Sequence, residues 1–275
     1  MTTKIVITGA TGFIGSALCK RLEKLKEYSI VKVTRSQDKF GFYKVNDYRS
    51  TPAGDILIHL GEDPNRIRVN KAGYPYQKKT KEVVKSLLKN NYKKIIYCST
   101  SVVYGDKESE PYNEKMQTYA NDTYSTAKLE NEKIILSTGG TVVRLSNVLG
   151  KEIIGNNVLT DIIRQLSTNE PMILHNIRPI RDFIWIDDVV NAILRLIKIE
   201  ASGIFNIGTG VPTSIYQLSK IALNISGQKD REINSVVSDA EYSYNVLNIK
   251  KLRDLTNWRP IVSVSQSIGK IVNHL

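Results

Sequence analysis

Short runs of apolar and β-branched residues recur along the chain, and more polar stretches separate them. Runs of this length, bounded by turn-forming residues, are typical of buried strands. They lie at residues 4–7, 30–34, 43–45, 55–60, 94–98, 141–150 (with an exit loop) and 204–207.

Helical spacing of apolar residues appears between several of these runs. After the first run, Leu18, Leu22 and Leu25 recur on one face of a helix. Helices are predicted over residues 16–25, 76–90, 124–136, 157–166 and 189–197, and from 214 onward. Strands that alternate with helices predict an α/β fold with a mostly parallel sheet.

A glycine-rich turn at residues 8–15 joins the first strand to the first helix. Small residues there let the backbone approach a pyrophosphate, whose charge then faces the amides and the positive dipole at the helix start. The sequence therefore predicts a dinucleotide site and a Rossmann-type doubly wound parallel sheet. The three glycines, Gly9, Gly12 and Gly15, are each three positions apart, whereas the usual fingerprint has steps of two and then three positions. The expected cofactor-binding residues of this turn are Gly9, Thr11, Gly12, Phe13, Ile14 and Gly15.

The formal net charge of +12 raises the possibility of a nucleic-acid partner. Lysines and arginines are scattered over the whole chain, however, and no basic cluster with a nucleic-acid motif appears. We expect no nucleic-acid binding, and we assign the charge to solubility and to attraction for anionic substrates.

The remaining composition predicts a cytoplasmic protein without a membrane span or a metal. No apolar run approaches the roughly 18 residues that a span needs, and the start of the sequence lacks a signal-peptide pattern. Cys19 and Cys98 have no ligand-like neighbours and are expected to be buried thiols in a reducing compartment. The three histidines are too dispersed to suggest a metal site.

The end of the second strand bears on cofactor choice. An acid near this position suits the ribose 2′-hydroxyl of NAD, whereas an arginine suits the 2′-phosphate of NADP. The chain has Thr34, Arg35 and Ser36 here, and its first carboxylate is Asp38. Arg35 and Ser36 therefore favour NADP(H), and NAD(H) remains possible.

A hydroxyl, a phenol and an ammonium form the candidate catalytic set. Hydroxyl residues at 99–101 follow the predicted strand at 94–98, and Tyr124 and Lys128 lie four residues apart, on one face of a later helix. Other Tyr/Lys pairs with this spacing follow no hydroxyl-bearing strand end. A free tyrosine has a pKa of about 10, and a nearby ammonium lowers it, which suits proton transfer near neutral pH.

The strings at 8–15 and 124–128 resemble the extended short-chain dehydrogenase/reductase family, in its branch of nucleotide-sugar epimerases, dehydratases and reductases. The resemblance implies that Thr100 contacts the reacting carbonyl and that Lys128 also binds the nicotinamide ribose. It places Asp47 at the adenine and Leu60 against the cofactor. Relatives usually have two small residues after that strand, so Glu62 is a departure.

Substrate residues are also carried over from the family. The resemblance implies substrate binding by Ser101, Asn147 and Arg181, with Arg181 at the diphosphate. Ser101 and Val102 stand where 4,6-dehydratases have an acid and a base, which argues against dehydration. A second phosphate-binding arginine of relatives aligns near Ser238, and Arg231 is a possible substitute.

The predicted domains are an NAD(P)-binding domain at 1–150, to which 182–210 return, and a smaller substrate-binding lobe from 151–181 and 211–275. The substrate is expected between them. The favoured function is reduction of a 4-keto nucleotide sugar by NADPH in carbohydrate biosynthesis. A nucleotide-sugar 4-epimerase with bound NAD and a non-catalytic dinucleotide sensor remain alternatives. The family also implies a homodimer.

Overall fold

The computed structural model describes residues 2–36, 40–152, 157–237 and 241–274. The chain forms two compact units, each with contributions from separate stretches of sequence. Unit 1 contains Met1–Gly105, Gln117–Leu145 and Ile193–Phe205, and unit 2 contains Asp106–Met116, Ser146–Ala192 and Asn206–Leu275.

Unit 1 is built on a sheet with the strand order β11-β6-β5-β4-β1-β2-β3. Parallel ladders join the neighbours from β6 through β3. The order reverses between β1 and β4, and ligands of open α/β sheets bind beyond the carboxyl ends of the strands at such a point. The strands are β1 (Thr3–Thr8), β2 (Tyr28–Thr34), β3 (Tyr43–Lys44), β4 (Ile56–His59), β5 (Lys94–Thr100), β6 (Thr141–Leu145) and β11 (Gly203–Ile207).

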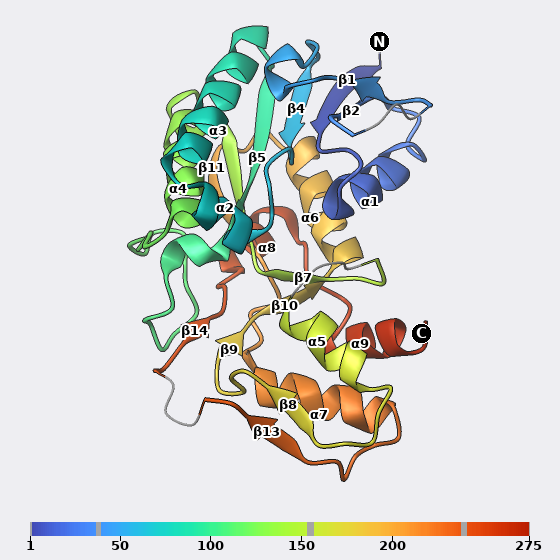
Figure 1. Ribbon diagram of the computed structural model, residues 1–275. Coiled ribbons are helices and arrows are strands. Elements are labelled where there is room, and N and C mark those ends of the chain that lie inside the picture. The colour runs from blue at the N-terminus through green and yellow to red at the C-terminus, as the bar shows by residue number, and fades with distance from the viewer. Residues whose placement is uncertain (1, 37–39, 153–156, 238–240, 275) are drawn as a thin grey trace. The chain divides into compact units, whose positions relative to one another are not determined.

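Helices cover both faces of this sheet, with α2, α3 and α4 on one side and α1 on the other (Figure 1). The central strands are buried on both faces, so they consist almost entirely of apolar residues, such as Ile5, Val6 and Ile7 in β1, which are fully buried. The helices of unit 1 are α1 (Phe13–Leu22), α2 (Arg66–Ala72), α3 (Tyr74–Leu87) and α4 (Thr123–Ser137), and α6 (Ile186–Lys198) begins in unit 2 and ends in unit 1. Short 3₁₀ helices are η1 (Tyr48–Ser50), η2 (Leu88–Asn90) and η3 (Ser101–Tyr104).

Unit 2 combines short strand pairs with helices. Strand β7 (Asn147–Leu149) pairs with β10 (Phe183–Trp185), and β9 (Ile180–Arg181) lies between β12 (Thr213–Ser214) and β14 (Tyr244–Asn245). A further parallel pair joins β8 (Met172–Leu174) to β13 (Ile233–Ser235). The helices are α5 (Val158–Gln165), α7 (Ile215–Ile225), α8 (Lys250–Thr256) and α9 (Val264–Val272), and α7 packs against both α5 and α9.

The predicted α/β class with a doubly wound parallel sheet is confirmed. The helix predicted over 189–197 begins earlier, at Ile186, so Asp187 and Asp188 lie in its first turn. The Asp188 carboxylate accepts hydrogen bonds from the amides of Ile261 and Val262, at 3.1 and 3.0 Å.

The two compact units differ from the predicted domains at their boundaries. Residues 106–116 and 146–150 cluster with unit 2, although both stretches lie within the predicted domain at 1–150. The amide of Tyr112 donates to the Val246 carbonyl, and strand β7 pairs with β10, so these segments make their backbone contacts within unit 2.

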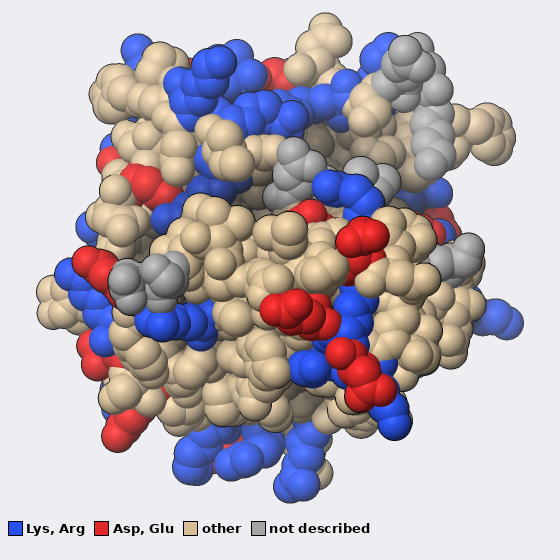
Figure 2. All heavy atoms as spheres, turned by 60° about the horizontal axis from the view of Figure 1, so that its bottom comes forward, with Lys and Arg blue, Asp and Glu red and all other residues tan. Residues whose placement is uncertain are grey.

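On the face drawn in Figure 2, lysines and arginines form several separate groups, with acidic side chains among them. Among the described residues, no single basic patch covers this face. None of the helices in the described ranges has both the length and the apolar character of a membrane crossing. Those ranges also contain no cluster of three or more His, Cys, Asp or Glu side chains placed to hold a metal ion.

Candidate active site

The glycine turn between β1 and α1 is held too closely for side chains. Gly9 has a φ of +69°, and a Cβ there would lie 2.5 Å from the Leu60 carbonyl oxygen. A Cβ on Gly15 would lie 2.2 Å from the Gly9 oxygen. Gly12 is the N-cap of α1 and provides no side-chain hydrogen bond. The turn therefore brings bare backbone to the start of a helix, as an anionic ligand requires.

Leu60 and Tyr48 support this turn from the neighbouring strands. The Leu60 amide donates to the Thr8 hydroxyl at 3.2 Å, which fixes the end of β4 against β1. The Tyr48 hydroxyl accepts a hydrogen bond from the Gly9 amide at 3.1 Å, and a Cβ on Gly61 would lie 2.4 Å from the Tyr48 ring. The pattern of the sequence contains no signal for Tyr48, because its contacts depend on the packing of β1, β4 and η1.

Three hydroxyls and a guanidinium gather at the end of β2. Thr11 Oγ1 lies 3.0 Å from Thr34 Oγ1 and 3.4 Å from Ser36 Oγ. The Arg35 guanidinium stacks over the Tyr48 ring, with its Cζ 4.7 Å from the ring centroid. Arg35 and Ser36 are exposed, whereas Thr34 is buried. Asp38 lies outside the described residues.

Asp47 has a local role at the end of β3. It caps η1, and its Oδ1 accepts from the amide and the Nε of Arg49, at 2.9 and 3.1 Å. Burial opposes ionisation of Asp47, but the hydrogen bonds from Arg49 prevail and lower its pKa. The predicted adenine contact is additional to this cap and stays a prediction.

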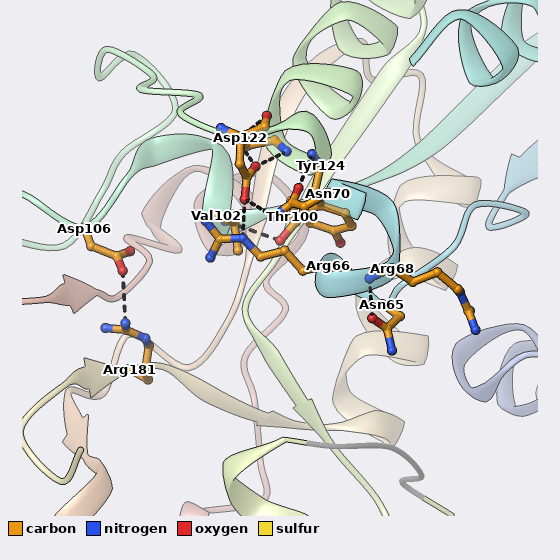
Figure 3. Close-up of polar contacts among 11 residues, drawn as sticks. Asn65, Arg66, Arg68, Asn70, Thr100, Val102, Asp106, Asp122, Tyr124 and Arg181 are labelled. Carbon is orange, nitrogen blue, oxygen red and sulfur yellow. Dashed lines mark hydrogen bonds and ion pairs between the residues drawn. The ribbon is translucent and has the colours of Figure 1, made fainter. Parts of the chain in front are cut away.

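Thr100 and Tyr124 come from elements that pack together, β5 with η3 on one side and α4 on the other. Thr100 is the N-cap of η3, and its Oγ1 accepts from the Val102 amide at 3.3 Å. Ser101 follows within η3 and is buried. The Tyr124 amide donates to Asn70 Oδ1 at 3.0 Å, so α2 contacts the first turn of α4 (Figure 3).

Asp122 fixes the start of the helix that bears Tyr124 (Figure 3). Its Oδ1 accepts from the Ser125 amide at 2.8 Å, and its Oδ2 accepts from Asn70 Nδ2 at 3.0 Å and from Arg66 Nε at 2.5 Å. Burial disfavours the ionised form of Asp122, but these hydrogen bonds outweigh it and lower the pKa of Asp122 to about 2. Arg66 and Asn70 were not predicted as site residues because α2 itself carries no strong apolar period.

Lys128 is buried beneath this turn. Its Nζ donates to the Cys98 carbonyl at 2.8 Å and lies 2.9 Å from Glu62 Oε2 and 5.1 Å from the Tyr97 ring centroid. Burial disfavours the ammonium, but the adjacent Glu62 carboxylate outweighs it, and the pKa of Lys128 is raised. Glu62 is thus the direct charge partner of the candidate catalytic lysine.

Asn147 and Arg181 belong to unit 2 and make structural contacts there. Asn147 Nδ2 donates to the Asp182 carbonyl at 3.0 Å. The Arg181 guanidinium donates to Asp106 Oδ2 at 3.0 Å (Figure 3). It also donates to the Ser243 hydroxyl at 2.7 Å. An anionic ligand of Arg181 therefore has to compete with the Asp106 carboxylate.

Arg231, considered from the sequence as a substitute phosphate contact, makes structural hydrogen bonds in unit 2. Its guanidinium donates to the carbonyls of Gln165 and Thr168, both at 2.7 Å, and to Gln228 Oε1 at 2.7 Å. These contacts hold the chain around α5 and occupy the donors of the side chain. Ser238, where relatives have an arginine, lies outside the described residues.

Comparison with known proteins gives a consistent family. Residues 5–208 match the model of the NAD dependent epimerase/dehydratase family. The chain is 29% identical over 244 residues to a GDP-6-deoxy-D-talose 4-dehydrogenase from Aggregatibacter actinomycetemcomitans, covering 81% of this chain and 80% of the relative. It is 25% identical over 304 residues to a GDP-6-deoxy-D-mannose reductase from Pseudomonas aeruginosa, covering 99% and 97%.

Solved structures of similar fold include an NADPH complex and an epimerase. RMD from Pseudomonas aeruginosa, in complex with NADPH, superposes with a TM-score of 0.86 at 22% identity over 99% of this chain and 98% of that one. A UDP-glucose 4-epimerase from Thermotoga maritima, with UDP-glucose, gives a TM-score of 0.85 at 23% identity over 99% and 98%. The glycine turn, the Tyr–Lys helix and the family match agree, and the chain belongs to the NAD-dependent epimerase/dehydratase family.

Proposed function

We propose that this protein is an NAD(P)-dependent oxidoreductase of nucleotide sugars and that it reduces a 4-keto group with NADPH. The observation that carries the choice of NADPH is the end of β2, where Arg35 and Ser36 are exposed beside the hydroxyls of Thr11 and Thr34. A guanidinium and hydroxyl donors suit a 2′-phosphate.

The residues present fit a nicotinamide dinucleotide. The backbone approach at Gly9 and Gly15 leaves no room for a Cβ, which suits a pyrophosphate at the start of α1. When bound, the nicotinamide supplies the hydride. The proposed cofactor-binding residues are Gly9, Thr11, Gly12, Phe13, Ile14, Gly15, Arg35, Ser36, Asp47, Leu60 and Lys128.

Tyr124, Thr100 and Lys128 perform the proton chemistry in this proposal. Tyr124 donates its phenolic proton to the carbonyl oxygen as that oxygen gains charge, and the Thr100 hydroxyl holds the same oxygen. Lys128 stabilises the phenolate that remains. Val102 stands where dehydratases have a base and cannot accept a proton. The chain therefore supports hydride and proton transfer without elimination of water.

Substrate recognition is assigned to Ser101, Asn147 and Arg181. Arg181 offers a planar set of donors that matches diphosphate oxygens. Its pairing with Asp106 has a side-chain exposure of 23% and 40%, so water and ions reach both partners. An exposed pair of this kind contributes little stability, and a diphosphate can replace the carboxylate.

Cofactor release and titration test the proposal first. The purified protein is denatured, any released nucleotide is identified, and the cofactor-free protein is titrated with NADPH and NADH. Preference for exchangeable NADPH, followed by turnover with a 4-keto nucleotide sugar, is the expected result. Near-stoichiometric NAD would instead indicate a 4-epimerase, because that reaction returns the hydride to its own substrate.

Two variants separate cofactor choice from catalysis. Arg35→Asp is expected to reduce NADPH affinity by about 10- to 100-fold while keeping NADH binding, since it replaces a phosphate partner with a repelling carboxylate. Arg21→Asp, in the last turn of α1, is the matched charge control and is expected to change neither NADPH affinity nor NADH affinity. Tyr124→Phe is expected to lower turnover by about 10²- to 10⁴-fold; full activity of this variant would contradict the mechanism and favour a different acid.

We also propose that the protein acts in a reducing cytoplasm and that it forms a homodimer. The thiols bear on the compartment: Cys19 and Cys98 are both free and buried, and burial raises the pKa of each thiol to about 12, so neither is a reactive thiolate. Light scattering of the purified protein at micromolar concentration tests the dimer. A monomer that remains fully active would overturn it.

A further inference from the structure

A buried acid lies directly beneath the proposed catalytic lysine. The Glu62 side chain is 7% exposed and follows β4, at a position where the family resemblance implies a small residue. Its Oε1 accepts hydrogen bonds from Tyr97 Oη and Asn131 Nδ2, both at 2.9 Å. Its Oε2 lies 2.9 Å from Lys128 Nζ. The carboxylate is therefore held in one orientation from β5 and α4 and faces the ammonium.

The Lys128 ammonium is held from two sides. The Cys98 carbonyl accepts one of its three donors at 2.8 Å, and Glu62 faces the same nitrogen. The Lys128 side chain is only 10% exposed. Because a long flexible side chain gains its position only from such contacts, Glu62 and Cys98 together decide where the charge of Lys128 lies.

Four titratable side chains around this pair, His59, Tyr76, Tyr97 and Cys98, are neutral near pH 7. Burial lowers the pKa of His59 to about 4, and its Nε2 is 3.9 Å from Glu62 Oε1. Burial raises the pKa values of Tyr97, Cys98 and Tyr76, so these groups keep their protons. Lys128 is therefore the cation in contact with Glu62.

Several charged groups on the elements packed against α4 have partners of their own, such as Lys81 of α3, which pairs with Glu130 at 3.5 Å. On β6, Arg144 pairs with Glu132 of α4 at 2.6 Å. In α2, Arg66 pairs with Asp122, the N-cap of α4, and Arg68 pairs with Asp63, which precedes α2. Lys128 is the cation one helical turn from Tyr124 on α4, and Glu62 is the acid that faces this cation.

We propose that Glu62 is a positioning residue that fixes Lys128 and balances its charge, and that it thereby sets the pH at which Tyr124 releases its proton. The inference rests on the proposed function, in which Tyr124 is the acid. Without Glu62, the ammonium would stabilise the phenolate more strongly, and Tyr124 would lose its proton at lower pH.

The direction of the effect does not depend on which group loses the proton. Tyr124 and Lys128 lie one helical turn apart on α4, so both are near the carboxylate that is removed. Removal of a nearby negative charge makes deprotonation easier for either group. Glu62→Gln is therefore expected to move the first apparent pKa of the pair downward by about one unit.

Titration of the cofactor-free protein tests this without catalysis. Protein labelled with ¹³C at tyrosine Cζ is titrated by NMR, and the Tyr124 signal is identified by its absence from Tyr124→Phe. Glu62→Gln keeps acceptors for Tyr97 and Asn131 but removes the charge. We expect its Tyr124 signal to titrate about one pH unit lower than in the wild type. An unchanged or higher titration would overturn the proposal.

The pH dependence of kcat for ketone reduction provides the second readout. The basic limb, where the acid loses its proton, is expected to shift downward in Glu62→Gln and to stay near the wild-type position in Glu62→Asp, which keeps the charge. Asp63→Asn is the matched control: it removes a neighbouring carboxylate that pairs with Arg68 at the surface, and its limb is expected not to move. A merely structural role of Glu62 would lower kcat without moving the limb.

The two proposals can fail separately. Full turnover by Tyr124→Phe would remove the proposed acid, yet the NMR titration would still measure the effect of Glu62 on Tyr124. If Glu62→Gln does not fold, the double variant Glu62→Gln/Lys128→Met removes both charges and is expected to fold. If the double variant also fails to fold, Glu62 acts through Tyr97 and Asn131 rather than Lys128, and the proposal is wrong.

Discussion

Two cations that the family resemblance assigns to ligand binding each have an acid as partner, but in different surroundings. In unit 1, Lys128 and Glu62 have side-chain exposures of 10% and 7%. In unit 2, Arg181 and Asp106 have exposures of 23% and 40%. The chemistry of the two pairs is similar, whereas their access to water differs.

This difference separates a permanent pair from an exchangeable one. A buried charge without its partner is strongly destabilising, so Glu62 and Lys128 need one another in every state of the enzyme. An exposed pair is screened by water and contributes little. Asp106, which also accepts hydrogen bonds from Ser243 Oγ at 2.9 Å and Asn245 Nδ2 at 3.2 Å, is the more accessible of the two acids, and under the proposed function it would yield Arg181 to a diphosphate.

Breaking the buried pair is expected to have the largest effect on stability. Lys128→Met leaves Glu62 buried and unpaired, and the free energy of unfolding is expected to fall by about 3–5 kcal/mol. The double variant with Glu62→Gln should recover much of this loss. Urea unfolding at pH 7 measures both, and equal stabilities of the single and double variants would contradict the pairing.

The Glu62–Lys128 pair also predicts how the stability loss of Lys128→Met depends on pH. Burial opposes ionisation of Glu62, but Lys128 prevails and holds its pKa below the usual 4.5. In the wild type the carboxylate thus stabilises the fold above about pH 4.5, and this contribution is lost as pH falls. In Lys128→Met, burial alone raises the pKa of Glu62, so acid relieves the penalty. The stability difference should shrink from pH 7 to pH 4.

A second buried pair controls for burial alone. Arg144 and Glu132 have side-chain exposures of 4% and 2%. Arg144→Met is expected to destabilise the fold by a similar amount, about 3–5 kcal/mol, but to leave the pH at which Tyr124 titrates in place. If the Tyr124 titration shifted in Arg144→Met as much as in Glu62→Gln, the shift would be a general effect of losing a buried charge rather than a specific effect of Glu62.

Asp122 is intermediate between the two pairs, with a side chain 14% exposed. Asp122→Ala removes the N-cap of α4 and is expected to lower stability by about 1 kcal/mol. Because the pKa of Asp122 is lowered to about 2 from 3.8, the wild-type advantage is present above about pH 4 and disappears as pH falls toward 2. Unfolding curves at pH 7 and pH 2.5 test this; a deficit independent of pH would argue against it.

Breaking the exposed pair is expected to change stability least. Asp106→Asn should alter the free energy of unfolding by no more than about 0.5 kcal/mol. Affinity for a nucleotide sugar should rise by about 3- to 10-fold, because the diphosphate no longer competes with a carboxylate at Arg181. Calorimetric titration measures this. Asp254→Asn, which breaks the exposed pair with Lys250, is the control and should leave affinity unchanged.

Local patterns account for the parts of the site that could be read from the sequence. The glycine turn and the Tyr124–Lys128 spacing depend on the strand and helix that contain them, whose hydrogen bonds are made within the element or with adjacent strands. The predicted strands and helices therefore recur as β1, α1, β5 and α4 with small changes at their ends. Helix α2 was missed, and with it Asn70, because a short polar helix has little periodicity.

The sequence by itself determined the α/β class, the glycine turn before α1 and the family of this chain, because these depend on residues close together along the backbone. Only the tertiary structure decided which acid faces each cation. Asp106 and Arg181 are 75 residues apart, and Asn70 reaches Asp122 across 52. Side-chain pairing over such separations depends on how strands and helices pack, and no periodic pattern encodes it. Glu62 appeared in the sequence only as a departure from relatives, and the fold placed it against Lys128.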